Sequence, residues 1–546
     1  MGHSTYKKYH FLRRDATRKK HSLHTNFDPH VCFCGRIFWA AAFILALATA
    51  AFFITHLYRK WDDSPVIVSI GARATQLIAI PFPAVTVCTM NKVRKAAAEQ
   101  ILNSRNPDDD LNKILLKDMC DDTFEAYDSS SGSSNDIVMT EYMQNRSGKW
   151  DTIQSFMTNV SQPCYEMIQS CYYAGQNQNC IEIFNPALTD EGICCSFNKL
   201  KRDLIFRNPR DLSDLNVTFP RDAANWTPEG GYPPNTPTGT LPWRPRGAGS
   251  HLGLTLILDA NIDDYYCSST SSIGFKVRLH NPVETPKVSE FGLLLTPGQE
   301  YRMVIRPTIT NASSSIRKIP ENKRLCVFSD EKYLKYYNTY TQRNCALECE
   351  ANYTLSICKC VPYYLPKDAN TTICAKKDEN CTMVARKAIE MRLVDESANT
   401  SNLGTENEGW TKPECQCLPG CSELSYRGTI SSAKVFGHNN FKKGYGTKNS
   451  IYFRKNMAVV HLFFTESQFM NYYKTELFGF TEFLSNTGGL LGLFLGFSFL
   501  SAVEVFYFIS MRLWFAMAQR RQQRQTSLIL ANSSHVNMVS PYPFAQ

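Results

Sequence analysis

The residues most able to do chemistry lie in an apolar stretch near the end of the chain. The stretch "SNTGGLLGLFLGFSFLSAVEVFYF" runs from residue 485 to residue 508 and contains four glycines, three serines and one carboxylate, Glu504. A carboxylate near the centre of a bilayer costs about 2.5–3.5 kcal/mol on insertion scales. Exposed backbone carbonyls at membrane depth are tolerated only where they line protein or water. Together these polar groups indicate a cation pathway.

The glycine spacing has a simpler interpretation of its own. Gly488, Gly492 and Gly496 recur every four residues, so one face of a helix would offer small residues that other helices can approach closely. A tethered receptor could use such a face for dimerisation. Ser498 could bond to a carbonyl one turn earlier, and Glu504 could lie at the cytoplasmic interface. We favour the cation pathway because it accommodates all of these groups at once.

Two stretches are long and apolar enough to cross a bilayer. Residues 37–58 and 483–503 contain no Asp, Glu, Lys or Arg, and each has about the twenty residues that a span requires. A cleaved signal peptide is the alternative for the first stretch. That stretch begins at residue 37, beyond the roughly 15–30 residues that a signal peptide occupies. The sequence therefore predicts two transmembrane spans.

The flanking charges predict the orientation. Eight Lys and Arg residues against two Asp precede the first stretch. After Glu504, which directly follows the second stretch, come four Arg and no further acid. By the positive-inside rule, both ends are expected in the cytoplasm of a plasma-membrane protein. A basic arm could instead bind nucleic acid, but these residues flank membrane spans, and we expect no nucleic-acid partner. The predicted organisation is a cytoplasmic N-terminal segment (1–36), a first span (37–58), an extracellular domain (59–476), a pre-pore segment with the second span (477–510), and a cytoplasmic tail (511–546).

The long central segment has the features of an extracellular, oxidised domain. It holds eighteen of the twenty cysteines, an even number as a disulfide framework requires. Closely spaced cysteines in "CALECEANYTLSICKC" and "CQCLPGC" could also bind zinc, but thiols in an oxidising compartment are expected to pair, so no metal is predicted. Nine glycosylation acceptors lie in the same segment: Asn145, Asn159, Asn216, Asn225, Asn311, Asn352, Asn370, Asn380 and Asn399.

Local patterns predict some elements of this domain. Alternating apolar segments at 82–88, 253–260, 301–309 and 457–466 predict strands. Residues 227–247 are rich in Pro and Gly and predict a loop. Residues 334–353 have helical spacing, with Cys345 and Cys349 on one face. No nucleotide-binding loop, Ser/His/Asp order or metalloprotease helix appears, so we expect neither an enzyme nor a cofactor.

Five motifs in this order resemble the degenerin/epithelial sodium channel family, most closely its insect pickpocket branch. They are "FPAVTVCTMN" (82–91), "GICCSFN" (192–198), "YTQRNCALEC" (340–349), "CQCLPGCSELSY" (415–426) and "LSNTGGLLGLFLGFSFLSAVE" (484–504). The resemblance implies an α+β membrane protein, in which two transmembrane helices flank a large disulfide-rich extracellular domain. That domain would contain a β-strand palm and ball and a helical finger and thumb. Similar proteins are trimeric channels.

The resemblance also implies most of the disulfides. The implied pairs are Cys88–Cys194, Cys171–Cys180, Cys326–Cys421, Cys345–Cys417, Cys349–Cys415, Cys358–Cys381 and Cys360–Cys374. Cys120, Cys164, Cys195 and Cys267 remain, and the sequence allows three pairings among them. We expect Cys120 to pair with Cys164 and Cys195 with Cys267.

Roles for the apolar stretch follow from the same resemblance. Gly496-Phe497-Ser498 matches the selectivity filter, where an unwound turn from each subunit would prefer sodium over potassium. Ser485 matches the degenerin position, at which a bulky side chain is associated with open channels. Gly492 matches the position that is linked to amiloride block. Glu504 would attract cations at the cytoplasmic mouth. Asn486, Gly488 and Gly489 belong to the same pore and gating stretch.

Two residues depart from the family pattern. Phe497 is bulkier than the small residue common in vertebrate relatives, so its side chain should point away from the pore axis. The cytoplasmic His-Gly gating motif is represented at best by His24-Thr25, which makes constitutive opening doubtful.

The predicted function is therefore an amiloride-sensitive sodium channel subunit of sensory or epithelial cells. A chemical, osmotic or mechanical stimulus outside the cell would open it, and the sequence leaves that stimulus open. The acidic clusters at 108–110 and 121–122 are interpreted as solvated faces rather than proton sensors. Expected partners are sodium ions, membrane lipid, and copies of the chain or related subunits in a homotrimer or heterotrimer. The alternative is a two-span adhesion or ligand-binding receptor without conduction.

Overall fold

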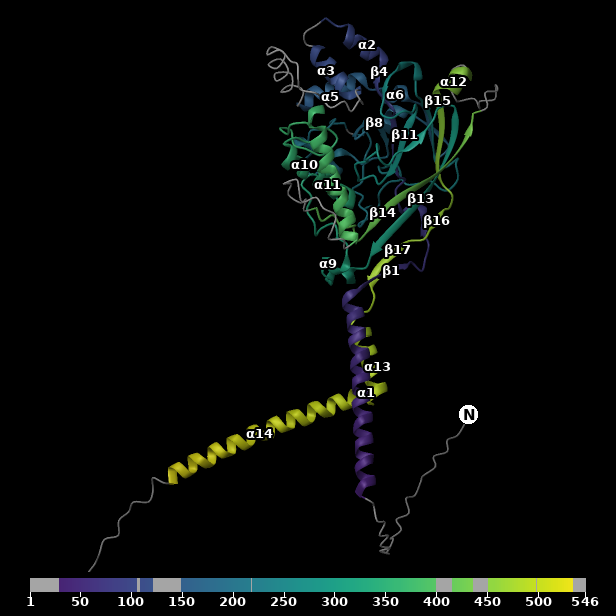
Figure 1. Ribbon diagram of the computed structural model, residues 1–546. Coiled ribbons are helices and arrows are strands. Elements are labelled where there is room, and N and C mark those ends of the chain that lie inside the picture. Colours follow the sequence, from purple (N-terminus) through teal and green to yellow (C-terminus); the bar gives the residue numbers. More distant parts are fainter. Residues whose placement is uncertain are drawn as a thin grey trace, which may run out of the picture. The chain divides into compact units, whose positions relative to one another are not determined.

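The computed structural model describes residues 29–105, 109–120, 149–217, 219–398, 415–435, 450–496 and 498–533. The chain divides into two units (Figure 1). The helical unit comprises Met1–Asp63 and Phe478–Gln546, and the large unit comprises Ser64–Leu477. His24, Phe497, Asn145, Asn399 and the acidic pair at 121–122 lie outside the described residues.

The described part of the helical unit forms α1 (Pro29–Asp63), α13 (Phe480–Leu495) and α14 (Phe499–Ser533). Among the described residues, one helical segment, Ile37–Asp63, is long and apolar enough to cross a membrane. It contains the first predicted span. The second apolar stretch is not a single helix, because a break separates α13 from α14.

Two sheets form the centre of the large unit. The eight-stranded sheet has the order β1-β17-β13-β15-β9-β5-β6, with β14 also paired to β13. Its strands are β1 (Val66–Ile70), β17 (Tyr472–Glu476), β13 (Gln299–Ala312), β15 (Met457–Phe464), β9 (Leu254–Asp259), β5 (Ile168–Tyr173), β6 (Gln176–Gln178) and β14 (Glu423–Lys434). The five-stranded sheet runs β12 (Leu293–Leu295), β11 (Phe275–His280), β3 (Ala84–Thr89), β8 (Gly192–Phe197) and β7 (Phe184–Thr189).

Two short strand pairs and a set of helices complete the large unit. The strand pairs are β10 (Tyr265–Ser268) with β4 (Asn91–Arg94), and β16 (Gln468–Phe469) with β2 (Thr75–Gln76). The α-helices are α2 (Lys95–Asn103), α3 (Asp109–Cys120), α5 (Trp150–Val160), α6 (Cys164–Met167), α7 (Cys180–Ile183), α8 (Arg202–Ile205), α9 (Glu321–Arg324), α10 (Gln342–Cys358), α11 (Glu379–Ala398) and α12 (Ser450–Asn456). The 3₁₀ turns are Leu77–Ala79, Pro209–Asp211, Ile262–Asp264, Ser314–Lys318 and Lys376–Asp378.

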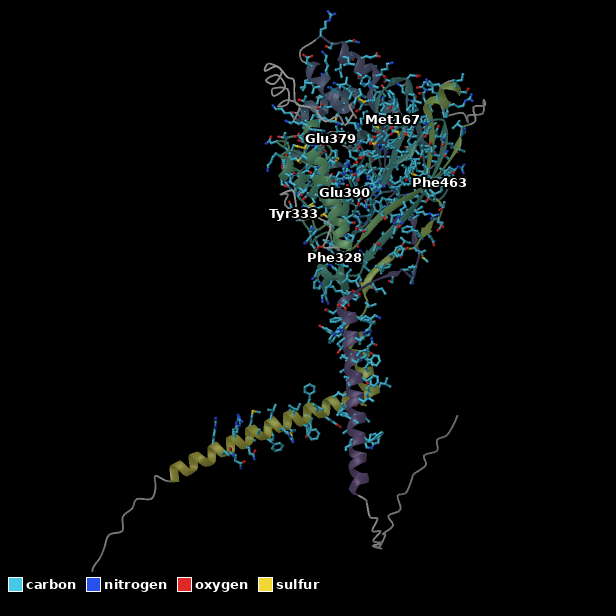
Figure 2. The ribbon with its side chains drawn as sticks, in the orientation of Figure 1. Met167, Phe328, Tyr333, Glu379, Glu390 and Phe463 are labelled. Atoms are coloured by element: carbon cyan, nitrogen blue, oxygen red, sulfur yellow. A yellow bond between two sulfur atoms is a disulfide. The ribbon has the colours of Figure 1, made fainter. Side chains whose placement is uncertain are left out.

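The local predictions for the large unit are confirmed. The four predicted strands correspond to β3, β9, β13 and β15, and residues 227–247 contain only turns and single bridges. Every residue of β9 is buried because the strand lies inside the sheet with both faces covered. The predicted helix corresponds to α10, but it begins at residue 342 rather than 334, where the Thr341 hydroxyl caps its start by accepting from the Asn344 amide at 3.1 Å. In Figure 2, Met167 lies within the core and Tyr333 at the surface.

Seven of the nine disulfides have the predicted partners, whereas the other two correct the prediction. Cys120 pairs with Cys267, and Cys164 pairs with Cys195. Cys120–Cys164 and Cys195–Cys267 are therefore wrong. The eighteen cysteines of the large unit all form disulfides, so its closely spaced cysteines are not zinc ligands.

The corrected pairing follows from the two faces of β8. Cys194 and Cys195 are neighbours in this strand, so their side chains point to opposite faces. Cys194 meets Cys88 of the adjacent strand β3. Cys195 belongs to the main apolar cluster, against which Cys164 also packs. Cys120 and Cys267 pack together against a second cluster, formed by β4, α2, α3 and α5.

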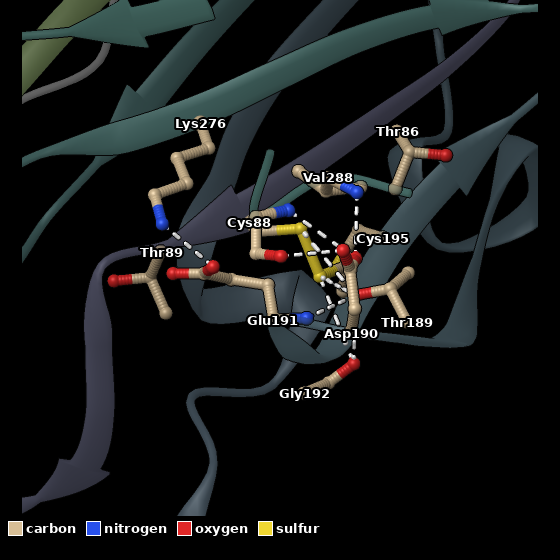
Figure 3. Close-up of a disulfide and its surroundings, with 12 residues drawn as sticks. Thr86, Cys88, Thr89, Thr189, Asp190, Glu191, Gly192, Cys195, Lys276 and Val288 are labelled. Atoms are coloured by element: carbon tan, nitrogen blue, oxygen red, sulfur yellow. Dashed lines mark hydrogen bonds and ion pairs between the residues drawn. A yellow bond between two sulfur atoms is a disulfide. The ribbon is translucent and has the colours of Figure 1, made fainter. Parts of the chain in front are cut away.

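The Cys88–Cys194 disulfide lies beside a buried ion pair (Figure 3). Lys276 Nζ lies 2.6 Å from Glu191 Oε2, with only 4% and 3% of the two side chains exposed. Glu191 belongs to the turn between β7 and β8, which ends at Gly192 with φ +117°, a conformation that favours glycine. The ion pair and the disulfide therefore fix this turn against β11 and β3.

A hydrogen-bonded chain of three side chains crosses the same sheet. His280 Nδ1 donates to the Asn281 carbonyl at 3.0 Å, so Nε2 accepts from the Thr86 hydroxyl at 2.9 Å. Thr86 in turn accepts from Ser196 at 2.6 Å. Burial, and to a lesser extent the charge of the nearby Lys199, lowers the pKa of His280 to about 3. The imidazole is thus neutral in the folded protein.

The corrected disulfides predict a specific peptide map. A non-reducing digest should yield peptides joined through Cys164–Cys195 and through Cys120–Cys267. Cys164→Ser should expose the Cys195 thiol to alkylation and destabilise the fold by about 2–5 kcal/mol, the usual cost of losing a native disulfide. Cys120→Ser, as the matched variant, should expose Cys267 instead. Recovery of a Cys120–Cys164 peptide would contradict this pairing.

The buried His280 predicts a pH-dependent stability. The unfolded chain binds a proton at this residue below its ordinary pKa of 6.5, whereas the folded chain does so only near pH 3. Stability should therefore fall as the pH drops from about 6.5 towards 3. His280→Gln should flatten this dependence in thermal melts of the full-length protein. His251→Gln, at an exposed position, is the control, and an equal effect of both variants would exclude His280 as the cause.

Candidate functional site

One face of α13 packs against α1. Phe494 stacks on Phe53 with ring centroids 5.8 Å apart, and Phe483 lies 5.4 Å from Trp61. Trp61 Nε1 also donates to the Phe478 carbonyl at 3.1 Å, just before α13 begins. Aromatic side chains near both ends of the helix therefore fix which face of α13 points to α1.

The small residues of α13 occupy the opposite face. At about 100° per residue, Ser485, Gly492 and Gly496 lie roughly 180–220° around the helix from Phe483. These three residues are exposed, as are Asn486, Gly488 and Gly489. A Cβ placed on Gly488, Gly489 or Gly496 would meet no atom within 4 Å. No described residue of this chain covers the face, which is thus open to lipid, water or another chain.

The helix breaks at Gly496. This residue has φ +62° and ψ 19°, in the left-handed region that glycine adopts at little cost. Its amide still donates to the Gly492 carbonyl at 3.0 Å, which closes the last turn of α13. The non-helical backbone proposed for the glycine-rich stretch therefore occurs at this position.

Two serines restart the helix after the break. Ser498 Oγ accepts from the Ser501 amide at 3.3 Å, and Ser501 Oγ accepts from the Ser498 amide at 3.4 Å. The two hydroxyls are 3.2 Å apart. This reciprocal arrangement is a capping box with serine in place of the usual Glu or Gln. Ser498 therefore caps the helix ahead of it, and the alternative bond to a carbonyl one turn earlier is not the one observed.

Glu504 lies beyond the cap on α14. It is six residues after Ser498, or about 9 Å along a helix at 1.5 Å per residue. Its side chain is exposed. The structure thus brings Gly496 and Ser498 together at one break, with Glu504 two turns away.

The described glycosylation acceptors lie at the surface of the large unit. Asn159, Asn216, Asn225, Asn352, Asn370 and Asn380 are exposed, and Asn311 is half-buried. Their accessibility is compatible with glycan attachment.

Several residues escaped the sequence analysis. The reciprocal cap of Ser501 was missed although the S-x-x-S spacing signals it. Glu284 and Glu423 were missed because no local pattern reveals burial, which raises the pKa of both carboxyl groups. They line a cavity of about 190 Å³ with Arg278 and Arg343. Asp110, from the acidic cluster that we interpreted as a solvated face, pairs with Lys113 at the surface.

Comparison with known sequences gives one family match over almost the whole chain. A profile of the family described as "Amiloride-sensitive sodium channel" matches residues 9–508.

Individual relatives cover similar lengths. The chain is 36% identical over 517 residues to "Pickpocket protein 28" of Drosophila melanogaster, covering 93% of this chain and 79% of that protein. It is 24% identical over 519 residues to "Sodium channel protein Nach" of the same organism, covering 92% and 88%. "Acid-sensing ion channel 4" of Mus musculus is 24% identical over 514 residues, covering 90% and 78%.

Proposed function

The chain belongs to the amiloride-sensitive sodium channel family, and on that premise we propose that α13 and the break after it line a sodium-selective pore. Relatives named as sodium channels, pickpocket protein and acid-sensing channel support a cation channel subunit. The finer proposal concerns which residues conduct, which select and which assemble.

The helix break carries this proposal. A bilayer offers no water to unpaired backbone groups, so a break at membrane depth is stable only against protein or a water-filled path. Gly496 and Ser498 hold the break through their own hydrogen bonds. The backbone carbonyl oxygens at the break could then replace part of the hydration shell of a small cation.

The orientation of α13 supports assembly around a central axis. Its aromatic face is occupied by α1, whereas its face of small residues is uncovered by any described part of the chain. Helices of neighbouring subunits could approach closely on that face. We therefore propose a trimer, made of this chain alone or with related subunits, in which Ser485 and Gly492 face the axis above the break.

The remaining residues take roles that agree with this arrangement. Gly492 leaves space for amiloride above the constriction, and Glu504 would attract cations towards the cytoplasmic mouth. Two spans would place both termini in the cytoplasm and the large unit outside the plasma membrane, where the exposed acceptor asparagines would carry glycans. An extracellular stimulus of unassigned type would open the pore.

Sodium current through an opened channel tests the function. Ser485→Phe should crowd the closed packing of the small face by roughly 1–3 kcal/mol, as overpacked cores do, and so hold the channel open without its stimulus. Oocytes expressing this variant should show an inward current that disappears when an impermeant cation replaces sodium. Amiloride should reduce the current, and Gly492→Leu should weaken the block.

Leu493→Phe is the matched control, because Leu493 is exposed on α13 and lies about 80° around the helix from Ser485. It should leave the resting current unchanged. Normal surface expression of Ser485→Phe without any sodium-dependent current would contradict the pore and favour a two-span receptor. A sodium current that amiloride does not block would refute only the role of Gly492.

Selectivity should depend on Ser498 more than on Glu504. Distinguishing sodium from potassium requires ligands held at a fixed spacing, whereas a carboxylate attracts both ions through the same Coulomb term. In the Ser485→Phe background, Ser498→Ala removes a cap worth about 0.5–2 kcal/mol and should shift the bi-ionic reversal potential. Glu504→Gln should mainly reduce the current.

Ser510→Ala serves as the control for Ser498→Ala. The Ser510 hydroxyl donates to the Tyr507 carbonyl of its own helix at 2.8 Å. Removing this hydroxyl should change neither the bi-ionic reversal potential nor the current. If Glu504→Gln abolished selectivity while Ser498→Ala preserved it, the filter would lie nearer the cytoplasmic mouth.

A further inference from the structure

A cavity of about 190 Å³ lies in the large unit where three segments of the chain meet. Residues in the ranges 278–284, 340–343 and 420–426 line it together with Pro228. An engineered protein cavity of about 150 Å³ binds benzene, so this cavity is large enough for a small organic molecule. Part of its wall is apolar, including Leu279 and Leu424, and part of it is charged.

Two arginines bring positive charge to this cavity. The guanidinium groups of Arg278 and Arg343 each lie 5.3 Å from the ring centroid of Phe291, so the two charges are near one another. Arg278 Nη1 donates to the Phe291 carbonyl at 3.1 Å. Arg343 Nε lies 3.7 Å from Glu284 Oε2, which is too far for a hydrogen bond. The Arg343 guanidinium makes no hydrogen bond with the described residues, so its N–H groups remain available to a ligand.

Two carboxyl groups line the same cavity and balance the arginines. Glu284, with 18% of its side chain exposed, interacts electrostatically with both arginines and with Glu423. Glu423 Oε1 accepts from the Gly420 amide at 2.6 Å, which fixes this carboxyl group at the start of β14. Lys474 also interacts with Glu423 but lies outside the lining. The four charged groups that line the cavity therefore have no net charge when all of them are ionised.

This balance of charge decides which class of ligand fits. Because buried charges need counter-charges, an anion or a cation in the cavity would leave one unit of charge uncompensated. A zwitterion adds no net charge, and each of its two ends can meet a group of opposite sign. An α-amino acid is a zwitterion whose ammonium group donates hydrogen bonds that carboxyl oxygens accept. A small apolar side chain would pack against the apolar part of the wall.

We propose that this cavity binds a small apolar α-amino acid. The carboxylate of the ligand would face the two arginines, and its ammonium group would face the two glutamates. The bound molecule would join β11, the start of α10 and the start of β14, so the large unit would respond to dissolved amino acids. This site is separate from the pore proposed above, and its test measures binding rather than current.

Equilibrium dialysis of the full-length protein in detergent micelles tests the site. The probes are tritiated glycine, L-alanine, L-valine and L-leucine, and one of them should bind to a single saturable site. The competitors are analogues of the tightest probe that lack its ammonium group or its carboxylate; for L-valine these are 3-methylbutanoate and isobutylamine. Each analogue should compete at least about tenfold more weakly, the effect of losing a hydrogen bond between charged groups.

Matched variants connect this preference to the cavity. Arg343→Gln should weaken binding of the amino acid and reduce its advantage over the amine, because the carboxylate loses its partner. Glu423→Gln should instead reduce the advantage over the carboxylate analogue. Arg302→Gln and Glu300→Gln are the controls, because these residues form an exposed pair outside the lining, and both preferences should persist. The two test variants act on opposite ends of the ligand, so either one keeps the test decisive if the other fails to fold.

Three outcomes would overturn the proposal. The first is the absence of saturable binding for all four amino acids. The second is an analogue that competes as strongly as the amino acid, since the cavity would then recognise a single charge rather than a zwitterion. The third is persistence of both preferences in Arg343→Gln and in Glu423→Gln, which would place the binding elsewhere on the protein.

Discussion

Every backbone amide and carbonyl removed from water needs a hydrogen-bond partner, and both units of the chain are organised by this constraint. In the large unit the partners come from strand ladders. The strand β13 alone pairs with β14, β15 and β17. In the helical unit the hydrogen-bond partners come from within each helix. At the interruption between α13 and α14, the hydrogen bonds of three residues replace those of a continuous helix. Gly496 closes the first helix, and Ser498 and Ser501 open the next.

The candidate site therefore depends on a small number of specific residues. A glycine that can adopt a left-handed conformation and a serine that can cap a helix occur two residues apart. The aromatic contacts of Phe483 and Phe494 with α1 decide which way the small residues around them face. Aromatic packing on one side of α13 and small side chains on the other are two aspects of the same arrangement.

The sequence predicted features that short-range patterns determine and missed those that arise from folding. Strand alternation located β3, β9, β13 and β15, and apolar length located the segment of α1 that is long and apolar enough to cross a membrane. Family resemblance implied seven disulfides correctly. The pairing of Cys120 and Cys164 was wrong because it depends on which apolar cluster each cysteine joins, and that is a tertiary property. The burial of His280 and Glu284 was likewise invisible, because it arises from segments that are distant in the sequence. The roles of Gly496, Ser498 and Glu504 in conduction stay predictions.

The register of β13 with β14 also has a mechanical consequence. Their antiparallel ladder runs from Gln299 opposite Lys434 to Thr310 opposite Glu423 without a bulge. A load applied to the two strands in opposite directions along their common axis would act on all of these pairs in parallel, in shear. A load that pulled the strands apart sideways would open the pairs one after another. The large unit should consequently resist extension along this axis far better than separation of the two strands across it. Because the paired strands would stretch little, a tension applied at one end of β13 would be transmitted almost fully to the other end.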